Sequence, residues 1–99
     1  MEGEGSTRRQ RIVELLTGTE RSFEELRREL EVPARALEDD LGHVERSLRR
    51  GPARLRVDPA RCLACGFTFE DRAPRRFLAP SRCPRCKSER IAEPRFLVL

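Results

Sequence analysis

The fold is decided by residues 62–86, which read Cys62-Leu-Ala-Cys65, then 17 residues, then Cys83-Pro-Arg-Cys86. This stretch holds all 4 cysteines of the 99-residue chain, in two Cys-x-x-Cys pairs. The two thiolates of one pair reach the same ion from a single tight turn, and two pairs supply the closed tetrahedral shell that structural zinc prefers. Gly66 follows the first pair, where the turn needs a backbone at positive φ. We therefore predict one structural zinc ion per chain, with Cys62, Cys65, Cys83 and Cys86 as its ligands.

Other uses of the four cysteines fit less well. Two disulfides suit a secreted chain, but residues 1–6 have neither the basic start nor the apolar run of a secretion signal. A redox Cys-x-x-Cys needs only one pair. Iron in the same sulfur cage remains the alternative metal. A catalytic zinc is not expected, because four protein ligands leave no open position.

Composition sets the class of protein. Only 37% of the residues are hydrophobic and 38% are charged, so the core must be thin, and a metal is a sensible way to support it. No apolar run approaches the ~18 residues of a membrane span. We expect a cytoplasmic protein that does not enter a membrane.

The first half of the chain predicts three amphipathic helices. Thr7 and Gln10 form a capping box for a helix that ends near Leu16, and Ser22 and Glu25 form a second one. Pro33 is expected at the first position of a third helix, which runs to about Arg49. A short helix, a tight turn and a longer helix, preceded by a supporting helix, are typical of a helix-turn-helix.

The period of the hydrophobic residues changes after Gly51-Pro52. Leu55 and Val57 alternate with arginines, which indicates a strand, and residues 95–99 form a second strand candidate. We predict that the two strands pair as an antiparallel hairpin whose tip is expanded into the zinc module. Phe67 and Phe69 suggest a further strand that leaves the first cysteine pair, followed by a loop over residues 70–79.

These elements predict an α+β protein: a three-helix winged helix-turn-helix with a two-stranded wing that is expanded into a four-cysteine zinc ribbon. Residues 1–6 are a flexible lead. Residues 7–58 and 90–99 form the winged helix-turn-helix, and residues 59–89 form the ribbon inserted in its wing.

The second half resembles a mainly archaeal family of predicted transcriptional regulators, in which a winged helix-turn-helix carries a rubredoxin-like zinc ribbon in its wing. The resemblance rests on Pro59-Ala-Arg-Cys62, Cys65-Gly-Phe67, Phe69, Pro80-Ser-Arg-Cys83-Pro-Arg-Cys86-Lys-Ser-Glu89 and Glu93-Pro-Arg-Phe96. A weaker similarity in the helices extends it over residues 8–98. It implies the same fold and, less directly, a regulatory role.

Charge is divided unevenly between the halves. Residues 1–50 carry 10 basic and 12 acidic side chains, a net −2, and residues 51–99 carry 11 and 5, a net +6. Zinc in four thiolates has a formal charge of −2, which brings the second half to about +4. A mildly basic ribbon favours nucleic acid, whereas Glu38-Asp39-Asp40 puts three acids on or beside the outer face of the third helix.

We therefore predict a DNA-binding transcriptional regulator. The alternative is an adaptor that docks proteins on its winged helix and ribbon and binds no DNA. A homodimer is left open. Without a Gly-rich phosphate loop, or a nucleophile beside a base, we expect no enzymatic activity. The predicted nucleic-acid contacts are Arg35, His43, Arg46, Arg54, Arg56, Arg75 and Arg76. Solvated surface is the simpler interpretation of the three on the third helix, whereas phosphate contact and solubilising charge fit the other four equally well.

Overall fold

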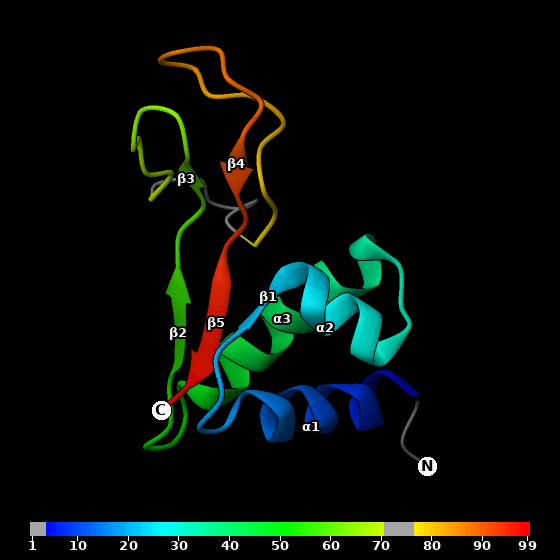
Figure 1. Cartoon of the computed structure of the whole chain (residues 1–99). Helices are drawn as coiled ribbons and strands as arrows, with labels where there is room; N and C mark the ends of the chain where they lie inside the picture. The colour runs from blue at the N-terminus through cyan, green and yellow to red at the C-terminus, as the bar shows by residue number, and fades with distance from the viewer. Residues whose placement is uncertain (1–3, 71–76) are drawn as a thin grey trace.

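The computed structural model describes residues 4–70 and 77–99. Three helices are followed by a long hairpin that projects away from them (Figure 1). The helices are α1 (Glu4–Leu16), α2 (Phe23–Leu30) and α3 (Ala34–Leu48), and the strands are β1 (Arg21–Ser22), β2 (Leu55–Asp58), β3 (Arg61–Cys62), β4 (Ile91–Ala92) and β5 (Arg95–Val98). The chain is thus a mixed α+β protein with small antiparallel sheets, as predicted.

Helix boundaries follow the sequence signals only in part. The capping box of Ser22 and Glu25 is present in α2, with both of its hydrogen bonds. The one predicted at Thr7 is wrong, because α1 begins at Glu4 and Thr7 lies inside the helix. Pro33 is the N-cap of α3 rather than its first residue. The helical pattern upstream of Thr7 is too weak in hydrophobic residues to be recognised from the sequence.

The predicted pairing of the two strands is confirmed, and one register runs through the whole hairpin. Asp58 of β2 is paired with Arg95 of β5, and three residues further along each strand Arg61 of β3 is paired with Ala92 of β4. The intervening register sets Pro59 opposite Pro94. Proline has no N–H to donate, so the ladder is interrupted at this point and the hairpin divides into two sheets.

The sequence did not predict β1, the strand that joins β2 and β5 in a three-stranded sheet. β1 has two residues and pairs with β5. The sheet next to the helices, which we call the lower sheet, therefore has the order β1-β5-β2, and the upper sheet consists of β3 and β4. Two residues are too few for an alternating pattern, and only the tertiary position of Arg21 and Ser22 makes them a strand.

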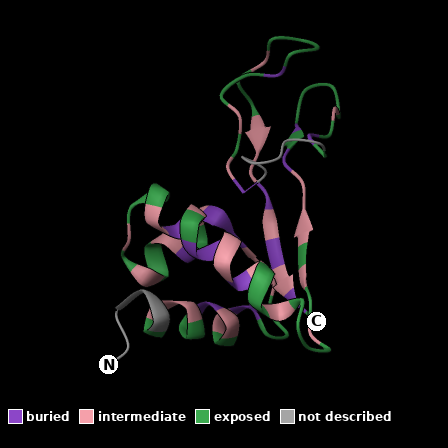
Figure 2. Cartoon of the chain, turned by 180° about the vertical axis from the view of Figure 1, so that it is seen from behind, coloured by how far each residue is buried: buried purple, intermediate pink, exposed green. Residues whose placement is uncertain are grey.

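The main core lies where the helices meet β5 (Figure 2). Phe96 is fully buried there and contacts the ring of Phe23 edge-on, with 6.5 Å between ring centroids. Phe77, which the sequence predicts in a loop, is buried against Phe96 with 6.0 Å between centroids. The segment between the two cysteine pairs therefore returns to the helical core.

Asp40 is buried, although the sequence analysis expected it on or beside the outer face of α3. It is fully buried, and it accepts hydrogen bonds from Nε of Arg8 and, at 3.0 Å, from Nε of Arg9. A buried carboxylate needs such partners, because desolvation of an unpaired charge is costly. Asp40 therefore joins α3 to α1 and does not belong to the outer face.

The N-terminus of α2 is tied to the hairpin. The N–H of Glu24 donates to Oε1 of Glu93 at 2.9 Å, and the N–H of Phe23 donates to the carbonyl of Pro94 at 3.2 Å. These are amides that a helix leaves without internal partners. Glu93 and Pro94, at the interruption between the two sheets, thus cap the helix that starts the α2–α3 unit.

We expect Glu93→Ala to lower the free energy of unfolding by ~1 kcal/mol, because one capping acceptor is removed and a negative charge leaves a helix N-terminus. Urea denaturation followed by far-UV circular dichroism measures the change. Glu89→Ala is the matched control, since Glu89 is the preceding glutamate in the chain but has an exposed side chain. Equal stabilities of the two variants would contradict the capping role.

No helix within the described residues is long and apolar enough to cross a membrane.

Candidate metal centre

Each cysteine pair sits in a turn with the same backbone hydrogen bonds. In the first, the N–H of Gly66 donates to the carbonyl of Cys62, and that of Cys62 donates to the carbonyl of Phe67. In the second, Lys87 and Ser88 take the places of Gly66 and Phe67 relative to Cys83. The two turns are therefore structural equivalents, and each carries its cysteines at the start and end of a loop that curls around one point.

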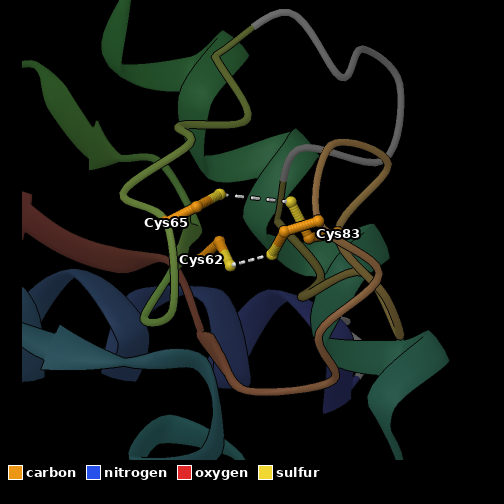
Figure 3. Close-up of side chains that lie close together, drawn as sticks. Cys62, Cys65 and Cys83 are labelled. Carbon is orange, nitrogen blue, oxygen red and sulfur yellow. Dashed lines mark hydrogen bonds between the residues drawn. The ribbon is translucent and has the colours of Figure 1, made fainter.

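The four sulfurs meet between these turns. All four Sγ atoms lie within 4.8 Å of one another. Cys62 is 3.5 Å from Cys86 and Cys65 is 3.6 Å from Cys83, contacts that run between the turns (Figure 3). A tetrahedron with metal–sulfur bonds of about 2.3 Å has edges of about 3.8 Å. The donor set and its dimensions thus fit one metal ion, and the separations are too long for disulfide bonds.

The cluster is open on one side. Cys62 and Cys83 are buried, whereas Cys65 and Cys86 are exposed. Beneath the buried pair lies a second, small core of Ala60, Cys62, Phe69 and Cys83, separate from the main one. Two of its four buried members are metal-binding candidates, so the ribbon has little apolar packing without them.

Cys62 and Cys65 differ in how readily they ionise in the absence of a bound cation. The pKa of Cys62 falls from 9.0 to about 7: burial raises it, but backbone N–H donors from Cys65 and Ala64 outweigh this. The pKa of Cys65 rises to about 12, because burial and hydrogen bonds to the other cysteine sulfurs overcome a lowering by the Phe67 amide. A divalent cation among the sulfurs would draw all four into the thiolate form.

Both cysteine turns contain a residue with positive φ, of which the sequence analysis predicted the first and missed the second. Gly66 has φ 79°, as its place after the first cysteine pair predicts. Lys87, its counterpart in the second turn, has φ 66°, in a region that residues other than glycine and asparagine seldom adopt. An alignment of the two Cys-x-x-Cys pairs in the sequence sets Lys87 at the position of Gly66, and this could have predicted the positive φ of Lys87.

Phe67 and Phe69 do not lie in a strand. Thr68 between them makes only an isolated bridge to Arg61. The two rings meet edge-on at 5.0 Å, and Phe69 is buried under the cysteines. The alternation was correctly recognised, but the tight turn leaves too little chain for a full ladder.

The residues predicted to contact nucleic acid do not gather at one place. Arg35 and Arg46 are exposed on α3, and Arg54 is exposed before β2. His43 is half-buried, with Nε2 3.8 Å from a carboxylate oxygen of Asp39. Arg56 lies 3.5 Å from Glu20 and 3.7 Å from Asp58. Arg75 and Arg76 lie outside the described residues.

Comparison with known proteins assigns both halves of the chain. The family model "PF0610-like, N-terminal" matches residues 7–56, and the "PF0610 rubredoxin-like zinc beta-ribbon domain" matches residues 59–98. The solution NMR structure of protein PF0610 from Pyrococcus furiosus is similar, with a TM-score of 0.79 and 37% sequence identity, over 100% of this chain and 93% of that one. A search of curated proteins finds no match. The chain belongs to the PF0610-like family.

Proposed function

We propose that this chain is a zinc-containing winged helix-turn-helix protein that binds double-stranded DNA and regulates transcription. Its role is non-catalytic, its metal is structural, and it works in the cytoplasm. The observation that carries the proposal is the positive charge of Arg35 and Arg46, which are exposed on α3 without an acidic partner among the described residues.

Zinc is favoured over iron because residues 59–98 match a zinc beta-ribbon domain, and four thiolates form the closed tetrahedral shell that structural zinc prefers. Metal analysis should give one zinc per chain. An iron-filled site would absorb visible light, whereas zinc, with a full d shell, would leave the protein colourless.

The order of the elements supports a winged helix. α1, β1, α2 and α3 are followed by the β2–β5 hairpin, with β1 against β5. In this interpretation α2, the turn at residues 31–33 and α3 form the helix-turn-helix, and the hairpin is the wing. The upper sheet and its metal centre extend the wing well past the helices (Figure 1).

Two of the three consecutive acids of α3, Asp39 and Asp40, have basic partners, whereas Glu38 has none within the described residues. Asp40 is buried against Arg8 and Arg9. Asp39 lies 3.7 Å from Arg9 and 3.8 Å from His43. Arg35 and Arg46 have no acidic partner within the described part of the chain, so their guanidinium groups are free to bind phosphate or a base edge.

Arg56 contributes less than the sequence predicted. Its guanidinium lies near Glu20 and Asp58, and Glu20 also accepts a 2.8 Å hydrogen bond from Arg95. That bond to Arg95 is the main cause of the lowered pKa of Glu20, which therefore stays ionised. Arg56 is held in this surface network. In the proposed complex, α3 and the ribbon therefore supply the contacts to DNA.

The test is a titration of random duplex DNA at several salt concentrations. We expect the logarithm of the association constant to fall linearly with the logarithm of salt concentration. Arg35→Gln should change the preference between sequences by ~1–3 kcal/mol if Arg35 reads a guanine. Arg49→Gln is the matched control, because Arg49 is exposed at the C-cap of the same helix but lies 3.7 Å from Glu45. A salt slope near zero for the wild type would contradict DNA binding and favour the protein adaptor.

A further inference from the structure

One face of the ribbon combines two arginines and an exposed leucine. Arg61 and Leu63 are exposed on either side of buried Cys62, so both point away from the metal centre. The N–H of Leu63 donates to the carbonyl of Arg90 at 2.8 Å, which continues the register of Cys62 with Ile91 and sets Arg90 opposite Leu63. Side chains directly opposite one another share a face. We call Arg61, Leu63 and Arg90 the ribbon face.

The hairpin explains why Leu63 is exposed. Along the common register, the ribbon face continues the side of the hairpin on which Val57 and Phe96 pack against the helices. The helices end below this point, as Figure 1 shows, and Leu63 keeps 52% of its surface exposed. An isolated exposed leucine is ordinary, so its neighbours decide whether it belongs to a binding surface.

Those neighbours are basic and unneutralised. Neither Arg61 nor Arg90 has an acidic partner among residues 4–70 and 77–99, whereas Arg82 lies 3.9 Å from Glu89. Arg61 and Arg90 are diagonal neighbours across the two strands, positions about 7–8 Å apart. Two arginines at neighbouring positions repel one another, and an anion bound between or over them relieves this repulsion. The distance also suits successive phosphates of one nucleic-acid strand.

We infer that the ribbon face is a second DNA contact, remote from α3, in which Arg61 and Arg90 bind backbone phosphates and Leu63 packs against the sugar between them. This inference rests on the proposed function, because it names a further part of the same DNA-binding surface. A phosphate ligand fits better than an acidic protein segment, because a guanidinium binds phosphate through two parallel hydrogen bonds. Charge on a strand of DNA also recurs at the regular spacing that two diagonal arginines need.

The experiment compares the salt dependence of duplex binding for matched variants of the full zinc-loaded chain. Arg61→Gln/Arg90→Gln should flatten the slope by about 1.8 units, or about 0.9 for each phosphate that the protein no longer neutralises. Arg11→Gln/Arg82→Gln removes the same charge from arginines that lie near Glu29 and Glu89, and it should leave the slope unchanged. Leu63→Ser should weaken binding about fivefold at every salt concentration without changing the slope.

Each result decides the question. Zinc content and far-UV circular dichroism first show that all variants keep the wild-type fold. If the wild type binds duplex DNA but the Arg61/Arg90 variant keeps its slope, the ribbon face is not a phosphate contact and the inference fails alone. If the wild type binds no DNA, the proposed function fails as well. A parallel titration with poly-glutamate tests an acidic protein as the ligand. If Arg61 and Arg90 are needed to bind poly-glutamate but not to bind DNA, the inference is overturned in favour of an acidic protein partner.

Discussion

Removal of the metal should unfold the ribbon while the helices keep most of their structure. The small core under the cysteines has only four buried residues, and Cys62 and Cys83 are two of them. Without a metal, the four thiols converge on one point with nothing to hold them there. Because metal binding and folding of such a module are one process, the metal contributes on the order of 10 kcal/mol to the folded ribbon.

Amide hydrogen exchange with and without a chelator measures this effect. Protection should disappear first at the N–H of Leu63, which is bonded across the ribbon to Arg90, and at the N–H of Cys83, which is bonded to Ser88 within the second cysteine turn. It should disappear later in α1 and α3. Cys83→Ser should reproduce the effect of the chelator. Ser81→Ala, two residues away at an exposed position, is the matched control and should behave like the wild type. A ribbon that stays protected in the chelated protein would refute a structural metal.

The sequence was most informative where short-range chemistry determines the structure. The capping box at Ser22 and the left-handed turn at Gly66 each depend on residues within a few positions, and both are present. The pairing of β2 with β5 is long-range, but a symmetric placement around the cysteines left few other arrangements.

The parts that were missed depend on tertiary contacts. Asp40 falls three residues after Leu37 and four before Val44, at the edge of the buried arc of α3, yet its charge suggested an outer position. Only the approach of Arg8 and Arg9 from α1 makes its burial favourable. Phe77 gave no periodic signal, because its partner Phe96 is 19 positions away in the chain.

Replacement of Phe96 with alanine should produce the largest loss of stability in the helical half. Phe96 is fully buried and contacts the rings of both Phe23 and Phe77. Its removal leaves a cavity between α2, β5 and the segment that returns from the ribbon. Substitutions of this kind cost ~3–5 kcal/mol, which is a large fraction of the stability of a 99-residue chain.

Urea denaturation of the zinc-loaded protein, followed by far-UV circular dichroism, measures that cost. Leu97→Ala is the matched control, because Leu97 is the next residue of β5, points to the other face of the sheet and is only half-buried; its effect should be much smaller. Phe77→Ala tests whether the ribbon supports the helices, and it should destabilise them in the same transition because the Phe77 ring rests on Phe96. If Phe96→Ala costs no more than Leu97→Ala, the main core does not centre on β5. If Phe77→Ala loosens only the ribbon, the two halves of the chain fold independently of each other.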